Sequence, residues 1–281
     1  MEPEQLAPKL GPEPKPVRPK SSGLHAIAIE LAAAEQTSLP IGLGRALHSQ
    51  VMNWLSLGDS HLANTIHTLQ TMPFSLSELK GLRRKIRDHK TKTQSGDEFY
   101  FRIGVLDGDL LPPLLDGLTM WGTKPISLVN CPFVIRQICA MPGSHPQVGS
   151  SDYHLLAKTP KSSDDITLQF LTPTSFKQQQ SVQPFPLPEL VFGSLGRRWD
   201  AFAPEELRFG AMAWQGLVSA FDLETHALKM EGGAEIGSVG WVRYRFPDPE
   251  QARVATILAH FATFAGVGRK TAMGMGQARY S

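Results

Sequence analysis

Hydrophobic and polar residues alternate in several short stretches of the chain, a pattern that indicates β-strands. In the first of these stretches, residues 24–32, Ile27, Ile29 and Leu31 occupy every second position. A period of two places these side chains on one face of a strand, where a core can bury them. Further strands are predicted at 97–106, 124–130, 165–171, 216–224 and 239–246, the last two forming a hairpin.

Other stretches carry apolar residues at the spacing of an α-helix. Leu43, Leu47, Val51 and Trp54 recur three or four residues apart, and Gly58 follows them. This pattern predicts a helix with one buried face. Further helical stretches are predicted at 60–70, 107–122 and 189–213.

The clearest helix of the chain is predicted at 249–265. Asp248 is a good N-cap residue, and Pro249 fits the first turn, where its missing N–H is not needed. Val254, Leu258 and other apolar residues form one stripe along this helix. Gly266 stands where a glycine commonly ends a helix.

Each half of the chain therefore runs in the order β-α-β-β-α-β, which is the order of a ferredoxin-like unit. We predict an α+β protein of two tandem ferredoxin-like domains. Residues 1–22 contain six prolines and mixed charges, and we expect a flexible tail there. The predicted domains span 23–140 and 152–281, and a linker rich in Pro, Gly and Ser, 141–151, joins them.

Composition excludes some classes of protein and leaves others open. The 281 residues are 41% hydrophobic and 19% charged, as in a packed globular protein. A net charge of +2 neither requires nor excludes a nucleic-acid partner. Cys131 and Cys139 fit neither a zinc pattern nor a disulfide framework, which favours a reducing cytoplasm. No stretch approaches the roughly 20 apolar residues of a membrane span, so we expect no membrane segment.

The last 17 residues, 265–281, contain a glycine-rich loop with two basic residues between its glycine pairs. The loop does not match a Walker motif, because it reads Gly-Arg-Lys-Thr and leaves no room for a following helix. It does not match a dinucleotide fingerprint either, because it follows a helix and has Thr271 in place of the third glycine. Both nucleotide-binding interpretations are therefore rejected.

The chemistry of the loop still suits an anion. Glycines let backbone amides approach an anion closely, and Arg269 and Lys270 add positive charge that can meet a phosphate. We therefore expect the loop amides and these two bases to hold phosphate. The alternative is a tight connection between a helix and a strand, with two solvated bases.

The spacing Gly-apolar-Gly, five residues, Gly-apolar-Gly at the C-terminal end resembles the signature of the RAMP superfamily of CRISPR-associated proteins. Within that superfamily, the chain resembles the repeat-processing endoribonucleases, the sixth Cas protein family. Weaker similarities to this family lie at 41–55, 166–176 and 237–246. The resemblance implies two ferredoxin-like domains that face each other across a central cleft.

The resemblance also implies an activity and its partners. The activity would be metal-independent cleavage of precursor CRISPR RNA within each repeat. The 2′-hydroxyl would attack the adjacent phosphate and leave a 2′,3′-cyclic phosphate and a 5′-hydroxyl end. The partners would be precursor and mature CRISPR RNA, with other Cas proteins of an effector complex as further candidates.

His48 matches the catalytic histidine on the first helix of this family. The helical pattern agrees with such a role, because Leu47 faces the core and His48 lies about 100° further round the helix. A free histidine titrates near pH 6.5, so it can transfer protons near neutral pH. The alternative is a boundary histidine that is only hydrogen-bonded, since the chain has nine histidines.

The sequence leaves the second catalytic group open. Some members of the family have a tyrosine upstream of the histidine and a lysine shortly after it, and neither occurs here. Arg45, Ser49 and Gln50 are nearby candidates. Arg269 or Lys270 would stabilise the phosphate from the other domain.

Basic residues form the remaining candidate RNA contacts. Residues 82–92 contain six Lys or Arg in eleven positions, which is either a solvated face or a surface that follows an RNA backbone. The predicted RNA-binding residues are Gly266, Gly268, Arg269, Lys270, Gly274, Gly276, Arg45, Arg83, Arg84, Lys85, Arg243 and Arg245. For Arg243 and Arg245, which share one strand face, solvent is the alternative.

No acidic residues and histidines gather at metal-ligand spacing, so we expect neither a metal site nor a cofactor. Two other functions stay open from the sequence. One is a non-catalytic RAMP subunit that binds guide RNA in an effector complex. The other is a general RNA-binding protein of ferredoxin-like fold.

Overall fold

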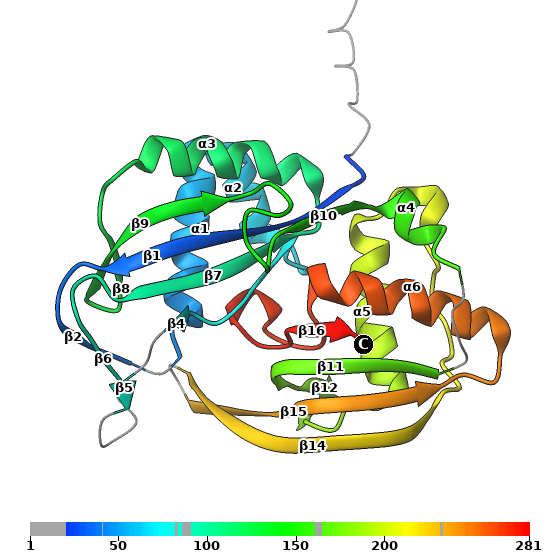
Figure 1. The fold of residues 1–281 in the computed structure, drawn as a ribbon. Helices are drawn as coiled ribbons and strands as arrows, with labels where there is room; N and C mark the ends of the chain where they lie inside the picture. Colours follow the sequence, from blue (N-terminus) through cyan, green and yellow to red (C-terminus); the bar gives the residue numbers. More distant parts are fainter. Residues whose placement is uncertain (1–20, 41, 82–83, 86–90, 161–164, 231–232) are drawn as a thin grey trace, which may run out of the picture.

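The computed structural model describes residues 21–281, apart from 41, 82–83, 86–90, 161–164 and 231–232. The predicted tail therefore lies almost entirely outside the described residues. The described chain forms two units, each a sheet with helices packed on one face (Figure 1). No helix among the described residues combines the length and the apolar content that crossing a membrane requires.

The first unit has the predicted order of elements. They are β1 (Gly23–Ala33), α1 (Gly44–Gly58), β3 (Phe74–Leu76), β7 (Glu98–Val105), α3 (Leu111–Trp121) and β9 (Cys131–Cys139). The strands lie in the order β3-β7-β1-β9, and each is antiparallel to its neighbour. This order confirms a ferredoxin-like unit. Shorter elements add to it: α2 (Ser60–Thr68), β4 (Lys80–Gly81), β8 (Ile126–Leu128), and a small sheet of β2 (Thr37–Leu39), β5 (Arg84–Lys85) and β6 (Thr91–Thr93).

The alternation in the first predicted strand corresponds to a buried face. Ile27, Ile29 and Leu31 of β1 are fully buried in one core with the apolar stripe of α1. Trp54 of α1 stacks on Phe101 of β7, with ring centroids 6.2 Å apart. The hydrophobic pattern therefore fixes which face of the sheet α1 covers.

The second unit repeats the same plan. Its elements are β11 (Asp165–Thr174), α5 (Pro188–Phe202), β14 (Leu217–Met230), β15 (Gly233–Arg245), α6 (Pro249–Ala265) and β16 (Ala278–Tyr280). The sheet order is β14-β15-β11-β16, again second, third, first and fourth. A short hairpin of β12 (Phe176–Gln178) and β13 (Ser181–Gln183) lies between β11 and α5. The prediction of tandem ferredoxin-like units is therefore confirmed.

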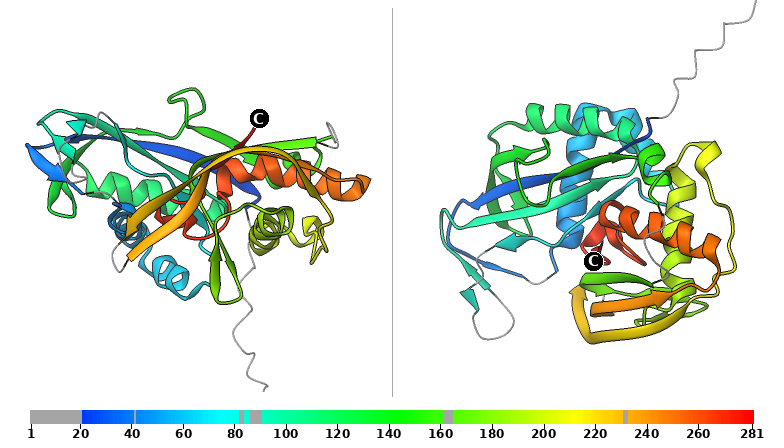
Figure 2. Two further views of the ribbon diagram at one scale, coloured as in Figure 1. Left: turned by 90° about the horizontal axis from the view of Figure 1, so that it is seen from below. Right: turned by 45° about the vertical axis from the view of Figure 1, so that its right-hand side comes forward.

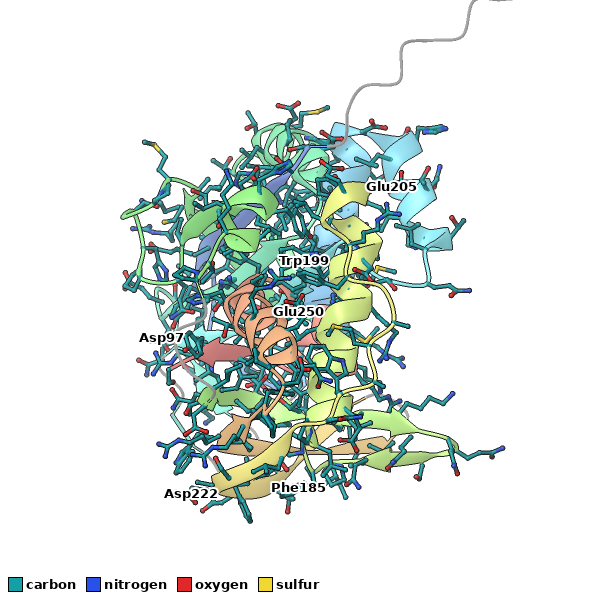
Figure 3. The ribbon with its side chains drawn as sticks, turned by 90° about the vertical axis from the view of Figure 1, so that its right-hand side faces the viewer. Asp97, Phe185, Trp199, Glu205, Asp222 and Glu250 are labelled. Atoms are coloured by element: carbon teal, nitrogen blue, oxygen red, sulfur yellow. The ribbon has the colours of Figure 1, made fainter. Side chains whose placement is uncertain are left out.

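Aromatic rings fill the core of the second unit. Trp199 of α5, labelled in Figure 3, contacts Phe261 of α6 at a centroid distance of 5.3 Å. It also contacts Tyr153 at 4.8 Å, which lies on the short helix α4 (Tyr153–Ala157). The Tyr153 hydroxyl donates to the carbonyl of Leu106, 3.0 Å away in the first unit. This buried side chain therefore ties the two cores together.

One predicted helix is shorter than expected. The pattern predicted helical structure over 189–213, but α5 ends at Phe202. Ala203 is extended, with φ −63° and ψ 150°, because the next residue, Pro204, disfavours the helical conformation before it. Only a 3-10 turn, η3 (Glu205–Leu207), follows. The predicted hairpin has longer strands than the alternation indicated, 217–230 and 233–245.

The end of the predicted linker is part of the first sheet. Strand β10 (Gly149–Asp152) pairs with residues 23–26 of β1. The domain boundaries stay a prediction.

The two units pack closely through α6. The hydroxyl of Ser75 in β3 donates to the carbonyl of Phe264 at 2.6 Å. A side chain on Gly104 of β7 would lie 2.1 Å from that same carbonyl oxygen. Glycine at this position lets α6 lie directly against the first sheet. The glycine-rich loop that follows α6, red in Figures 1 and 2, therefore lies between the two units.

Candidate functional site

His48 lies on α1 and contacts both units. Its ring lies 5.4 Å from the ring of Phe74 in β3, between centroids. Its Nδ1 lies 3.2 Å from the carbonyl oxygen of Ala272, in the glycine-rich loop. A carbonyl oxygen only accepts a hydrogen bond, so Nδ1 carries the proton in the neutral ring. Nε2 is then the basic nitrogen.

The surroundings of His48 favour this neutral form. The side chain is half-buried, and burial lowers the pKa of His48 below its usual 6.5. The hydrogen bond to Ala272 raises the pKa, and the nearby charge of His67 lowers it again. The net shift is downward, so His48 is mostly neutral at pH 7 and can accept a proton.

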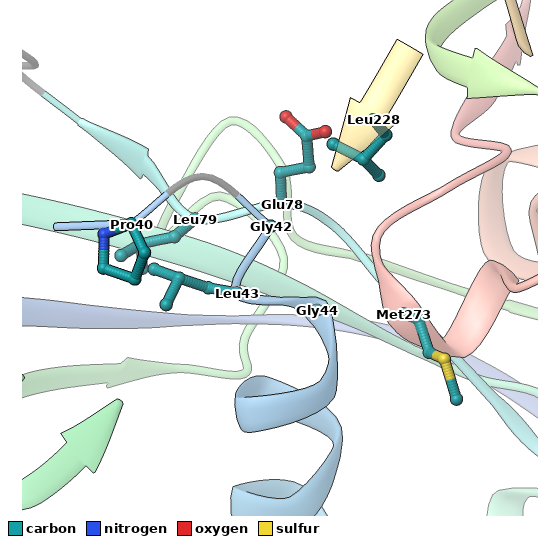
Figure 4. Close-up of a pocket in the computed structure, with 8 residues that line it drawn as sticks. All are labelled: Pro40, Gly42, Leu43, Gly44, Glu78, Leu79, Leu228 and Met273. Carbon is teal, nitrogen blue, oxygen red and sulfur yellow. The ribbon is translucent and has the colours of Figure 1, made fainter. Parts of the chain in front are cut away.

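A single 3-10 turn presents the Ala272 carbonyl to His48. This turn, η4 (Thr271–Met273), follows Lys270, which has the left-handed φ of 53°. The turn lies against the start of α1, where a side chain on Gly44 would come within 2.0 Å of the Met273 oxygen. Figure 4 shows Met273 beside the first turn of α1. Glycine at position 44 thus permits the close approach that brings Ala272 to His48.

The same contact region contains a small pocket between the units. It measures about 40 Å³, space for one or two waters. Leu228 of β14 and Met273 line it from the second unit (Figure 4). The residues from the first unit are Pro40, Gly42, Leu43, Gly44, Glu78 and Leu79.

The four glycines of the loop are needed for its backbone shape. Gly266, Gly268, Gly274 and Gly276 have φ between 68° and 90°, where other residues are strained. The amide of Gly266 donates to Ala262, that of Gly268 to the Ser194 hydroxyl, and that of Gly276 to Pro173. These three amides are directed into the protein and not toward a phosphate. The expectation that the loop amides hold an anion is therefore wrong for these three, because the tight connection uses them.

Arg269 and Lys270 lie at the edge of the loop and share one acidic partner. Glu235 of β15 accepts from Lys270 Nζ at 2.6 Å and from Arg269 Nη1 at 3.1 Å. Chiefly the Lys270 hydrogen bond, together with the charges of both bases, lowers the pKa of Glu235. Both bases therefore lie close to the turn that holds His48.

The candidates for a second catalytic group occupy different faces of α1. Arg45 and Ser49 are exposed, and Arg45 precedes His48 by one turn, so the two share a side of the helix. Gln50 is only 6% exposed and faces the core. The structure therefore removes Gln50 from the group around His48.

Of the remaining predicted RNA contacts, the structure describes the side chains of Arg243 and Arg245 only, and these do not join this cluster. Arg83 lies outside the described residues, and Arg84 and Lys85 form β5, of which only the backbone is described. Arg243 and Arg245 lie on the face of the second sheet opposite α5 and α6. Arg245 donates twice to Asp165, at 2.7 and 2.8 Å.

The sequence patterns did not reveal Arg198 of α5. Its guanidinium is buried, and it donates to the hydroxyl of Thr271 and to the carbonyl of Met72 at 3.4 Å. Arg198 thus connects α5, the turn η4 and the first unit. The sequence did contain an indication that this arginine is buried, because position 198 falls on the apolar stripe that includes Val191, Leu195 and Phe202.

Among the described residues, no group of three or more His, Cys, Asp or Glu is placed to hold a metal ion. The polar groups around His48 are instead a backbone carbonyl and basic side chains. Such groups can exchange protons and attract a phosphate.

Comparisons with known proteins point to one family. The family model for the CRISPR-associated endoribonuclease Cas6 matches residues 168–278. Curated Cas6 endoribonucleases from two Mycobacterium tuberculosis strains are 34% identical over 118 residues, or 40% of this chain. The matched region spans 37% of the length of these relatives.

Solved structures extend the similarity over both units. A product complex of Thermus thermophilus Cas6 has a TM-score of 0.77 and 26% identity, covering 93% of this chain and 100% of that one. A second Cas6 product complex has a TM-score of 0.71 and 27% identity, covering 92% and 99%. A RAMP protein that binds different RNA substrates shares the fold, with a TM-score of 0.61 and 15% identity over 92% and 99%. With its glycine-rich loop and tandem ferredoxin-like units, the chain is therefore similar to the Cas6 endoribonucleases, in sequence over residues 168–278 and in fold over both units.

Proposed function

We propose that this protein cleaves precursor CRISPR RNA within its repeats and that His48 transfers the proton. The position of His48 carries the proposal. Its Nδ1 donates to Ala272, its ring is half-buried, and its pKa lies below 6.5. A neutral imidazole with one nitrogen already hydrogen-bonded presents the other nitrogen as a base. Similarity to the Cas6 endoribonucleases, two of which have structures as a product complex and a substrate mimic complex, supports RNA as the substrate.

The reaction proposed for this site needs no metal. Nε2 of His48 removes the proton from the 2′-hydroxyl next to the cleaved bond, and the resulting oxygen attacks the phosphorus. The bond to the 5′-oxygen breaks, and this oxygen takes up a proton from water, which leaves a 2′,3′-cyclic phosphate on one product and a 5′-hydroxyl on the other. DNA lacks the attacking hydroxyl and would not be cut.

Positive charge beside His48 would stabilise the phosphate as it reacts. Arg269 and Lys270 directly precede the turn that contacts His48, and Arg45 lies one turn before His48. Fixed charges at the reacting phosphate lower the barrier because they need not reorganise. In this proposal the first domain, 23–140, supplies the base, and the second, 152–281, supplies the loop. The protein would work in the cytoplasm and pass mature RNA to other Cas proteins.

The first prediction tests the role of His48. The His48→Ala variant should bind the CRISPR repeat RNA of the same genome as wild type does but cleave it at least about 100-fold more slowly, because proton transfer is lost. The assay uses end-labelled repeat RNA in EDTA, with gel analysis of the product ends. His61→Ala, which changes an exposed histidine of α2, is the matched control and should cleave normally.

Two further results complete this test. Repeat RNA with a single 2′-deoxynucleotide at the cleavage position should remain intact. Unchanged cleavage by His48→Ala would remove His48 from the mechanism. Tight binding of repeat RNA without cleavage by the wild-type protein would instead favour a subunit that only holds guide RNA.

A further inference from the structure

Arg102 of β7 is a buried cation that has no acidic partner within the described part of the chain. Its side chain is 4% exposed, and its Nε donates to the carbonyl of Gln147 at 3.1 Å. Its Nη2 is buried and has no hydrogen-bond partner among the described residues. Burial lowers the pKa of Arg102 to about 10, which is still well above neutral, so the side chain remains charged.

Such an arrangement is unfavourable for folding alone. A buried charge without a counter-charge loses its hydration and gains little in return. An unpaired N–H of a guanidinium is one of the strongest donors available to an anion. Arg102 therefore provides what an anion-binding site needs, at a cost to the unliganded fold.

Arg102 lines a pocket of about 210 Å³ between the two units. The described lining residues include a second arginine, Arg279 of β16, and no aspartate or glutamate. Arg279 is exposed, and its Nε donates to Gln169 at 2.8 Å. The pocket thus combines two cations with an apolar wall that includes Leu171 and Phe264.

The surface beside the pocket suits a chain of nucleotides better than a single small anion. Gln169 of β11 pairs in register with Arg279 on one side and with Trp241 of β15 on the other. Trp241 lies on the sheet face opposite the buried Val242, and the guanidinium of Arg243 lies 5.9 Å from its ring centroid. Trp241 is partly exposed, and cations beside an accessible aromatic ring are a usual means of holding single-stranded nucleic acid.

We propose that the pocket around Arg102 binds a phosphate group of single-stranded RNA, with Arg279 as the second cation. The choice of RNA rests on the proposed function. The site is separate from His48, because Phe101 and Ile103 point into the core under α1 and Arg102 points to the opposite face of β7. The RNA strand would continue from this pocket across the outer face of the second sheet.

The test measures how a fluorescein-labelled ten-nucleotide uridine RNA binds to the full chain over a range of salt concentrations. Arg102→Gln should weaken binding about tenfold. It should also reduce the slope of log affinity against log salt by about 0.7, the value for one phosphate of a single strand. Arg102→Lys should keep the slope. The matched control is Arg136→Gln, which removes an exposed charge from β9 of the same sheet and should bind like wild type.

Thermal unfolding without RNA separates binding from a structural role. Because Arg102 is an unpaired buried charge, Arg102→Gln should unfold at the same temperature as wild type or higher. A lower unfolding temperature in both Arg102→Gln and Arg102→Lys, with uridine RNA affinity lost in both, would indicate a structural arginine and overturn the proposal.

The binding measurements can also contradict the proposed phosphate site at Arg102. No measurable uridine RNA binding by wild type, or equal affinity in wild type and Arg102→Gln, would overturn it. If inorganic phosphate raised the unfolding temperature of wild type but not of Arg102→Gln, while uridine RNA affinity did not depend on Arg102, the pocket would be a site for free anions and the proposal would be overturned.

Cleavage of repeat RNA is a separate measurement. Intact cleavage with Arg102-independent binding contradicts only this inference, and absent cleavage with Arg102-dependent binding contradicts only the proposed function.

Discussion

His48 is held by contacts from two distant parts of the chain. The ring of Phe74 packs on one side, and the carbonyl of Ala272 accepts from Nδ1. The first contact removes water from the imidazole, and the second selects the tautomer. Together they make His48 a neutral base whose free nitrogen is determined by a backbone atom. No side-chain substitution removes that acceptor directly, so the pH dependence of the reaction is the most direct measure of this environment.

The second prediction concerns that pH dependence. The base form of His48 is neutral, so the rate of cleavage should rise with pH through the pKa of His48 and then level off. Because burial lowers this pKa, the midpoint of the rise should lie below 6.5. Single-turnover cleavage at saturating repeat RNA between pH 4.5 and 8 measures it. A midpoint above 6.5 would contradict the described environment of His48.

At the scale of an element, the glycine-rich loop connects the second unit to the first. Its glycines adopt left-handed conformations, and its amides are tied to α6, β11 and α5. The turn η4 then projects toward α1 in the other unit. Arg198 of α5 donates to Thr271 of this turn and to the carbonyl of Met72 in the first unit, so it links the turn to both units. The loop is therefore a structural clamp that carries its two bases at the edge.

The third prediction tests this clamp by a double-mutant cycle. Thr271→Val keeps the size of the side chain but leaves a donor of the buried Arg198 without its acceptor. We expect the free energy of unfolding to fall by about 1–3 kcal/mol, the usual cost of an unsatisfied buried donor. The double variant Thr271→Val/Arg198→Met should be less destabilised than the sum of the single variants, because both partners are then apolar. Urea unfolding measures all four proteins, and strict additivity would show that the two side chains do not act together.

At the scale of the whole molecule, folding partly buries titratable groups in more than one place. Burial lowers the pKa values of His25, His48 and His260 alike. In the unfolded chain these histidines titrate near about pH 6.5. Below that value the unfolded state therefore binds more protons than the folded state.

The fourth prediction follows from this difference. The free energy of unfolding should fall as the pH is lowered from 7 to 5, because protons favour the unfolded chain in that range. Glu235, whose pKa is lowered by Lys270 and Arg269, adds a further loss only as the pH falls below the usual carboxyl value of 4.5. Urea unfolding at pH 7, 6 and 5 checks the first range. His25→Gln should show a shallower dependence, and a flat profile in wild type would contradict the lowered pKa values.

How much of the site the sequence reveals depends on how local each feature is. His48 was predicted because it stands beside an apolar helical stripe and matches a family position. Arg102 was not singled out, since it occupies an alternate position of a strand where a polar residue is expected. Its burial results from α6 and the segment around Gln147 on the other face of the sheet. Arg198 interrupts an apolar stripe, but its partners lie 73 and 126 residues away.

The sequence by itself determined the order of strands and helices, the repeated β-α-β-β-α-β plan and the position of the glycine-rich loop. These features depend on periodicity and on residues that are neighbours in the chain, so local physical rules are sufficient for them. Only the tertiary structure decided that the loop amides bond inward, that Ala272 meets His48 across 224 residues, and that Arg102 is buried without a counter-charge. These features depend on which segments, distant in the chain, pack against one another, and no local pattern describes those surfaces.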